Sequence, residues 1–203
     1  MVYQDTIGVG LTLAGRPFVV YGAFGESDAA PISQLHKRMV SVEPLDESSR
    51  LNGHSSPVPY KPIRFHNMKV LAVVGNFLQT GTLYRQTKEG RRPPYGVLQA
   101  VLHQLGDGQN GHYTPLIAGS VVIGSDRSDF TLGITHPKGP KAILWNHPPI
   151  GNALTMSTPS SNSGPHFNRA RDVATLVRLD GDTPEDLAEE MFMLRRGLGI
   201  VSD

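Results

Sequence analysis

Residues 93–123, PPYGVLQAVLHQLGDGQNGHYTPLIAGSVVI, contain the clearest structural signal in this chain. The two prolines suit the first positions of a helix. One helical stripe of apolar side chains follows, made of Val97, Leu98, Val101, Leu102 and Leu105. Residues 106–111 are rich in glycine and end the helix, and Pro115 favours extended backbone at Thr114. We therefore predict a helix, a polar turn at 112–114 that suits small-molecule chemistry, and a buried strand.

The composition predicts a globular protein with one hydrophobic core. The chain has 203 residues, of which 38% are hydrophobic and 18% charged, so a single domain over 1–203 is expected. The net charge of +1, with scattered basic residues, argues against a nucleic-acid partner. No apolar run approaches the roughly 20 residues that span a bilayer, and no secretory signal is visible, so a cytoplasmic location without membrane contact is expected. The absence of cysteine excludes disulfides and thiolate chemistry.

Outside this stretch, apolar runs typical of strands alternate with a few helical segments. Strands are predicted at residues 6–13, 16–21, 38–42, 63–65, 69–75, 116–123, 130–134, 142–145 and 173–179. Helices are predicted at residues 79–89, from Pro93 to the glycine-rich turn, and at 183–197. The last helix begins with a hydroxyl cap, a proline and two acids. Many strands with about three helices predict an α+β layered fold.

Three segments read as loops because they are polar and rich in small residues. They are residues 22–33, 46–62 and 147–168. The third is long enough to be either a mobile surface loop or a lid over a ligand, and the sequence leaves both readings open.

Polar residues gather at three strand ends. They are Arg64-Phe65-His66-Asn67, then residues 75–80 (GNFLQT), and His112-Tyr113-Thr114. A helix start in the second cluster offers backbone N–H groups to an anion. No metal site is expected, because the eight histidines lack ligand spacing and no cysteine can assist. Three such clusters in one small sheet predict a shared pocket.

Four segments, taken in order, resemble one known family. They are residues 15–21 (GRPFVVY), His66-Asn67, residues 73–80 (VVGNFLQT), and 113–119 (YTPLIAG) behind the Pro93-Pro94 helix. This order over roughly residues 5–135 is similar to that of the archaeal-type IMP cyclohydrolases, small enzymes of purine biosynthesis. The resemblance implies a hydrolase that closes the ring of 5-formamidoimidazole-4-carboxamide ribotide, with loss of water, to give inosine monophosphate.

The same resemblance implies a fold and a set of site residues. The fold is a four-layer αββα sandwich like that of N-terminal nucleophile hydrolases, here without a terminal nucleophile because Val2 follows Met1. The implied catalytic residues are His66, Asn67, Asn76 and Tyr113. The implied substrate-binding residues are Tyr21, Arg38, Thr80 and Thr114. No metal, cofactor or covalent nucleophile is implied, the only expected partner is the ribotide, and homo-oligomer formation is expected from the resemblance alone.

Each implied role has a chemical reason. The reacting groups belong to one molecule, so the protein has to hold the reactive conformer. Amide donors such as Asn67 and Asn76 suit the oxyanion that develops on the formyl group. His66 and Tyr113 suit proton transfer, and Arg38 suits the phosphate.

Two alternatives remain open. The first is a non-catalytic relative that binds a nucleotide or another phosphorylated ligand, because Glu26 and Leu116 stand where the family carries arginines. The second is a self-processing amide hydrolase of the same fold that exposes Thr6 or Ser41 as a new N-terminus.

Overall fold

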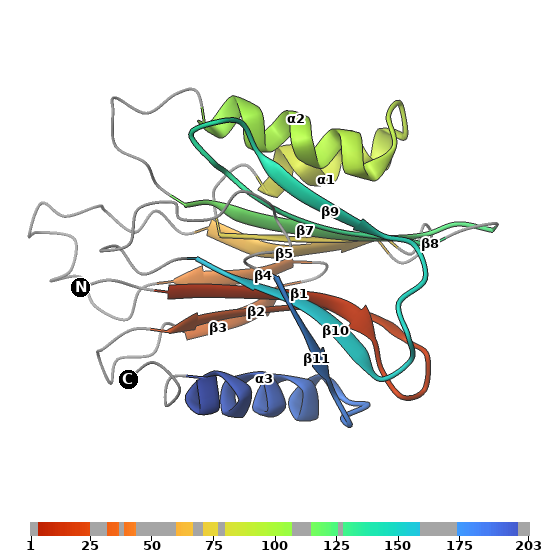
Figure 1. Cartoon of the computed structure of the whole chain (residues 1–203), viewed down its shortest axis with the longest axis vertical. Helices are drawn as coiled ribbons and strands as arrows, with labels where there is room; N and C mark the ends of the chain where they lie inside the picture. Colours follow the sequence, from red (N-terminus) through yellow and green to blue (C-terminus); the bar gives the residue numbers. More distant parts are fainter. Residues whose placement is uncertain are drawn as a thin grey trace, which may run out of the picture.

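Two antiparallel β-sheets lie face to face in the computed structural model (Figure 1). The structure describes residues 4–24, 32–36, 39–43, 60–66, 71–76, 80–106, 115–125, 128–158 and 174–198. Sheet A contains, in spatial order, β11 (Ala174–Arg178), β10 (Asn152–Ser157), β1 (Gln4–Leu11) and β2 (Pro17–Phe24). Sheet B contains, in spatial order, β3 (Ile32–His36), β4 (Met39–Glu43), β5 (Tyr60–His66), β6 (Leu71–Gly75), β7 (Ile117–Ile123), β8 (Ser128–Ile134) and β9 (Lys141–Trp145).

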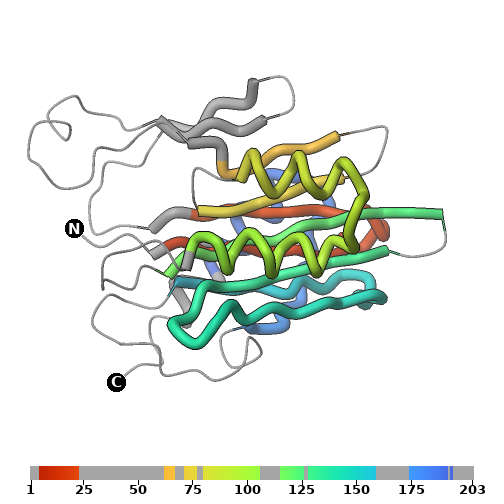
Figure 2. The backbone as a smooth tube through the Cα atoms, turned by 90° about the horizontal axis from the view of Figure 1, so that it is seen from above, coloured from red at the N-terminus to blue at the C-terminus, as the bar shows by residue number. Residues whose placement is uncertain are grey.

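Helices cover the outer faces of both sheets. The helices are α1 (Thr80–Glu89), α2 (Pro94–Gly106) and α3 (Pro184–Leu198). In Figure 1, α1 and α2 cover the face of sheet B that points away from sheet A, and α3 covers the lower face of sheet A. Figure 2 shows α1 and α2 beside each other over sheet B. The predicted α+β layered fold is therefore confirmed, with the layers in the order helix, sheet, sheet, helix. Among the described residues no helix is both long and apolar enough to cross a membrane.

The main core lies between the sheets. Ile7 and Val9 of β1 are fully buried there and pack with Phe130, Leu132 and Ile134 of β8. Each such side chain contributes about 1.5–3 kcal/mol when it leaves water. Because side chains alternate along a strand, Gly8 and Gly10 face the other way, towards α3.

That outer face of β1 is occupied by glycines because neighbouring groups approach it closely. A Cβ on Gly8 would lie 2.8 Å from Val20 Cγ1, and one on Gly10 would lie 2.2 Å from the Asn152 carbonyl oxygen. α3 packs on this side through Leu187 and Met191. Glycine therefore lets the neighbouring strands β2 and β10 approach β1 closely on the face that α3 covers.

The helical stripe predicted after Pro93 is confirmed. Val97, Leu98, Val101 and Leu102 of α2 are buried against sheet B, and Leu105 is partly buried beside them. The helix begins at Pro94, as the proline signal indicates. The polar turn at 112–114 lies outside the described residues.

The predicted irregular loop at 147–168 is wrong for part of its length. Residues 152–157 form β10, which pairs with β1 on one side and β11 on the other. Leu154 and Met156 alternate onto the inter-sheet core, but the strand is short and flanked by proline, serine and glycine. Long-range pairing with β1 supplies the stability that the local pattern does not indicate.

The other two predicted loops are shorter than expected. β2 continues to Phe24 and β3 begins at Ile32, so both ends of the predicted loop 22–33 are strand. β5 begins at Tyr60, inside the predicted loop 46–62. The remaining predicted strands and helices are found, with boundaries that shift by a few residues.

The sandwich has two ends that carry different residues. At one end, which we call the Asp5 end, lie the first residues of β1 and the last residues of β2, β6 and β10. At the other, the hairpin end, residues 12–16 join β1 to β2, and β5 turns into β6.

Candidate functional site

Three polar side chains from both sheets meet at the Asp5 end. The Tyr21 hydroxyl donates to Asp5 Oδ1 at 2.6 Å, and Asn76 Nδ2 donates to Asp5 Oδ2 at 2.8 Å. Asp5 and Tyr21 belong to sheet A, whereas Asn76 directly follows β6 of sheet B. We call Asp5, Tyr21 and Asn76 the strand-end cluster.

Strand alternation explains why these side chains face one another. Asp5 is in phase with Ile7 and Val9, so it projects towards the same inter-sheet face at the open end of β1. Tyr21 is likewise partly buried against that core. A carboxylate between two stacked sheets needs donors, and the phenol and the amide provide them.

The Asn76 side chain is held at both of its polar atoms. Its Oδ1 accepts the Ile117 N–H at 2.8 Å, and its Nδ2 also lies 3.5 Å from the Pro115 carbonyl oxygen. Because a backbone N–H can only be accepted by Oδ1, the orientation of the amide is determined. Asn76 therefore ties the end of β6 to the start of β7 and directs a donor at Asp5.

The backbone of Asp5 is fixed as firmly as its carboxylate. Its N–H donates to Thr158 Oγ1 at 2.9 Å, and the Thr158 N–H donates to the Asp5 carbonyl at 2.8 Å. Thr158 follows β10 and is buried. The cluster is thus preorganised by the strand on either side of β1.

The structure brings together two of the eight predicted site residues. Tyr21 and Asn76 share the Asp5 carboxylate. Thr80 is buried at the first position of α1, in the helical layer of sheet B. The predicted residues Arg38, Asn67, Tyr113 and Thr114 lie outside the described residues.

His66 lies at the opposite end of sheet B from Asn76. It ends β5 and pairs with Leu71 at the start of β6, whereas Asn76 follows the end of β6. Five residues of strand separate these ends, which is roughly 16 Å. His66 lines a mostly apolar pocket of about 150 Å³ with Pro17, Phe18, Phe65, Leu71, Ala72 and Val121. The structure therefore does not place its imidazole with the strand-end cluster.

Sequence reasoning missed Asp5, which joins the cluster. The available signal is an acid in register with the apolar residues Ile7 and Val9 on a strand that is otherwise β-branched and small. An acid on the core-facing side of a strand requires partners, and those partners come from residues far away in the sequence.

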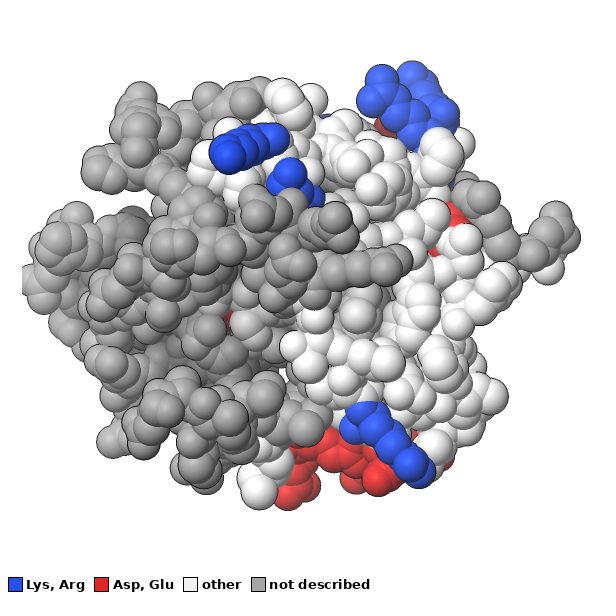
Figure 3. All heavy atoms as spheres, viewed as in Figure 1, with Lys and Arg blue, Asp and Glu red and all other residues white. Residues whose placement is uncertain are grey.

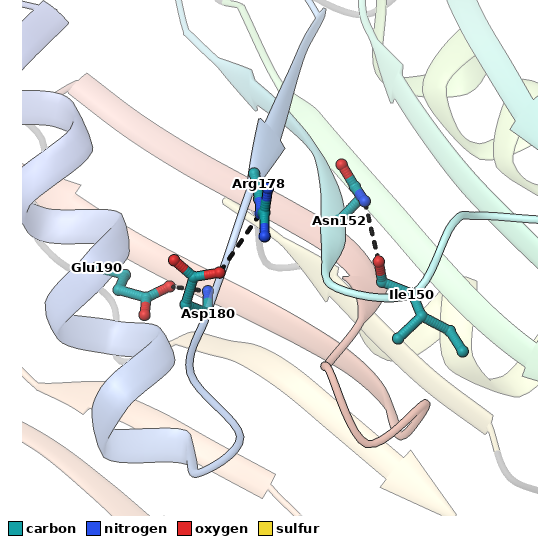
Figure 4. A network of polar contacts seen from close by, with 5 residues as sticks. All are labelled: Ile150, Asn152, Arg178, Asp180 and Glu190. Atoms are coloured by element: carbon teal, nitrogen blue, oxygen red, sulfur yellow. Dashed lines mark hydrogen bonds and ion pairs between the residues drawn. The ribbon is translucent and has the colours of Figure 1, made fainter.

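Charged groups on the outside of the molecule form a separate, solvated surface. Figure 3 shows acidic side chains gathered at the edge of the molecule where α3 lies in Figure 1. Figure 4 shows the polar contacts there: Arg178 Nε lies 3.4 Å from Asp180 Oδ1, and the Asp180 N–H donates to Glu190 Oε2 at 3.0 Å. The same view shows Asn152 donating to the Ile150 carbonyl at the hairpin end, at 3.0 Å. Exposed ion pairs of this kind contribute little to the free energy of unfolding.

One exposed carboxylate connects α3 to the β1–β2 hairpin. The Ala14 N–H donates to Asp182 Oδ1 at 2.8 Å. This backbone hydrogen bond, with a side-chain hydrogen bond from Thr12 and the charge of Arg16, lowers the pKa of Asp182 below its ordinary value of 3.8.

Within the described part of the chain, no group of three or more His, Asp or Glu side chains is arranged to hold a metal ion. No known protein-family model matches the chain, and no curated protein sequence matches it.

Proposed function

We propose that this protein is a cyclohydrolase that closes the ring of 5-formamidoimidazole-4-carboxamide ribotide to give inosine monophosphate. The strand-end cluster is the observation that supports it, because Tyr21 and Asn76, two residues assigned from the sequence, share one carboxylate between the sheets. The helix, sheet, sheet, helix layering agrees with the proposed relation to N-terminal nucleophile hydrolases.

The main chemical task of the protein in this reaction is proton transfer. The carboxamide nitrogen adds to the formyl carbon, so a C–N bond forms, the formyl C=O becomes a C–OH single bond, and the proton that leaves the nitrogen is matched by one gained at the formyl oxygen. The carbinolamine then loses its hydroxyl group and the proton of the formamido nitrogen as water, and a C=N bond forms. We assign the base to Asp5, and the proton supplied to the departing hydroxyl to Tyr21, whose hydroxyl already donates to Asp5.

Asn76 takes a positioning part in this scheme. Its amide is engaged with Asp5 and with the backbone of Pro115 and Ile117, so it orients the base. Because attacking and attacked groups belong to one substrate, holding them in a reactive conformer supplies much of the acceleration. A small set of proton-transfer groups is then sufficient.

The test follows inosine monophosphate formation by absorbance for the wild-type protein and two tyrosine variants. Tyr21→Phe removes the hydroxyl that donates to Asp5 and is expected to lower kcat about 100-fold. Tyr95→Phe is the matched control and is expected to keep normal turnover, because the Tyr95 hydroxyl on α2 lies 3.5 Å from the Ala142 carbonyl of β9, away from the strand-end cluster. Absence of turnover by the wild type overturns the proposal.

A non-catalytic phosphorylated-ligand binder is the second candidate, and the position of Leu116 favours it. Leu116 is partly buried against the apolar cluster of α1, α2 and sheet B, where the resemblance expects an arginine. A rise in melting temperature with inosine monophosphate, without any turnover, identifies this alternative.

The self-processing hydrolase is addressed by intact mass. Thr6 lies within β1 and pairs with Gly22 and Ser157, and its Oγ1 lies 2.7 Å from Ser157 Oγ on the face of β1 away from the Asp5 carboxylate. Ser41 lies within β4. A purified chain whose mass corresponds to a start at Met1 or Val2 excludes processing at either residue.

A further inference from the structure

We propose that the pocket at the hairpin end is a binding site for an uncharged aromatic ring of about the size of benzene. The inference goes beyond ring closure, because the pocket lies at the opposite end of β6 from the strand-end cluster and its occupancy does not depend on turnover of a ribotide. It rests on the lining of the pocket, on the register of sheet B and on the incomplete burial of one alanine.

Both sheets contribute to this pocket, which has a volume of about 150 Å³. Its lining residues come from the start of β2 in sheet A and from three neighbouring strands of sheet B. They are Pro17 and Phe18 of β2, Phe65 and His66 of β5, Leu71 and Ala72 of β6, and Val121 of β7. Of these residues only His66 is polar, so the lining suits an apolar ligand.

The register of sheet B explains why there is space at this point. Ala72 pairs with Phe65 on one side and with Val121 on the other, so the three side chains form one row on one face of the sheet. Val121 packs in the core between the sheets, so this row faces sheet A. Pro17 lies on the facing side of sheet A, in phase with Val19 of the same core. A methyl group between two larger side chains therefore leaves a hollow in the row.

The exposure of Ala72 shows that the described residues do not fill this hollow. Ala72 belongs to β6, the middle strand of the seven-stranded sheet B, and has a paired strand on each side. The next two residues of β6, Val73 and Val74, are 0% exposed, whereas Ala72 is only partly buried. Apolar atoms that border an unfilled space lack dispersion contacts, and an apolar ligand of matching size supplies them.

The size and the lining of the pocket indicate a small aromatic ring. An apolar cavity of about 150 Å³ accommodates benzene. Phe65 supplies an aromatic wall, and contacts between aromatic rings are more favourable than the burial of their area alone. None of the described residues that line the pocket is Lys, Arg, Asp or Glu, so a charged ligand would lose hydration without gaining an ion pair.

The first experiment measures the melting temperature of the protein with and without benzene. A ligand that binds only the folded state raises the melting temperature, by about 3–6 °C at a concentration of about ten times its Kd. Ala72→Leu fills the hollow and is expected to abolish the rise. Ala188→Leu makes the same change on the exposed surface of α3 and is the matched control that keeps the rise. Absence of a rise in the wild type, or equal rises in the two variants, overturns the proposal.

A second measurement uses the wild-type protein alone, so it does not depend on whether Ala72→Leu folds. Methyl resonances are followed by NMR while benzene is added. The ring current of bound benzene is expected to shift the methyl signals of Leu71, Ala72 and Val121, which line the pocket. The methyl signals of Ile134 and Met156, which belong to the core near the Asp5 end, are expected to stay in place. Equal shifts in both groups, or no shift in the first group, contradict the proposed site.

The aromatic character of the ligand is tested with cyclohexane, a ring of similar size without π electrons. Contact with Phe65 is expected to give benzene a Kd about two- to tenfold lower than that of cyclohexane. Phe65→Leu removes the aromatic wall and is expected to remove this difference. Equal Kd values of the two rings for the wild type contradict the aromatic class. Binding of benzene by a wild type without turnover rejects the proposed ring closure and leaves this site standing.

Discussion

The two ends of the sandwich hold their polar groups in different ways. At the Asp5 end, one carboxylate receives hydrogen bonds from both sheets, from Tyr21 at 2.6 Å and from Asn76 at 2.8 Å. At the hairpin end, His66 lines a mostly apolar pocket, and its buried Nδ1 has no partner among the described residues. Among the residues that the structure describes, only the first end holds a carboxylate between two donors, the arrangement that the proposed proton transfer requires.

The two ends also differ in what their polar contacts are expected to support. Asp5, Tyr21 and Asn76 join sheet A to sheet B, so their removal is expected to affect both the fold and turnover. At the hairpin end, Asp182, which precedes α3, binds the Ala14 N–H on the surface. Loss of this contact is expected to affect the fold but not the proposed turnover.

The largest effect is expected from Asp5→Ala. The substitution leaves the Tyr21 hydroxyl and the Asn76 amide without their acceptor, so the free energy of unfolding should fall by about 2–4 kcal/mol. Urea denaturation measures it. Asp180→Ala, which removes an exposed ion pair with Arg178, is the control and should cost less than about 1 kcal/mol. Equal losses in the two variants contradict the role of Asp5 in joining the sheets.

A smaller loss is expected from Asn76→Asp, which keeps the shape of the side chain. It replaces a donor to Asp5 by a second carboxylate, so the two repel at neutral pH and the free energy of unfolding falls by about 1–3 kcal/mol. The deficit relative to wild type should shrink in acid, when one of the two carboxylates is protonated. A deficit that stays constant from pH 7 to pH 4 in urea denaturation contradicts the contact.

How far the sequence predicts this molecule depends on the range of the interactions. The α2 stripe and the Thr183-Pro184 start of α3 are local signals, and both are confirmed. β10 is held in place by β1, about 150 residues earlier in the chain, and no local pattern indicates it. The candidate site likewise depends on contacts between residues that are far apart in the sequence.

The candidate site contains some of the residues predicted for it, but their positions depend on the course of the strands. The resemblance implies Tyr21 and Asn76 as site residues, and the two do meet, but only through Asp5, which lies 71 residues from Asn76. The sequence predicts one pocket for His66 and Asn76 because both stand in polar clusters at strand ends of the same small sheet. The whole length of β6 runs between them, because His66 pairs with its first residue and Asn76 follows its last. The two side chains therefore lie at opposite ends of that strand.

A His66→Gln substitution is expected to change little. The imidazole lies at the hairpin end, away from the strand-end cluster, so the free energy of unfolding should change by less than about 1 kcal/mol. Thermal denaturation checks this expectation. A loss above about 3 kcal/mol indicates that the hairpin end depends on a buried polar contact and removes the contrast with the Asp5 end.

The smallest effect is expected from Asp182→Asn, and it depends on pH. Hydrogen bonds from Ala14 and Thr12 lower the pKa of Asp182 in the folded state, so the carboxylate stabilises the fold at pH values above 3.8. That contribution disappears as the pH falls below 3.8 through the lowered pKa. The melting temperature of the wild type should therefore be slightly higher than that of the variant at pH 7, and the two melting temperatures should be equal at pH 2. A difference that grows in acid contradicts this linkage.

The central claim, that ring closure takes place at the Asp5 end, is tested most directly by one rate comparison. The rate of inosine monophosphate formation from the formamido ribotide is measured for Tyr21→Phe and His66→Gln beside the wild type. We expect a loss of about 100-fold in Tyr21→Phe and a rate within about twofold of wild type in His66→Gln. A loss in His66→Gln with full activity in Tyr21→Phe contradicts it.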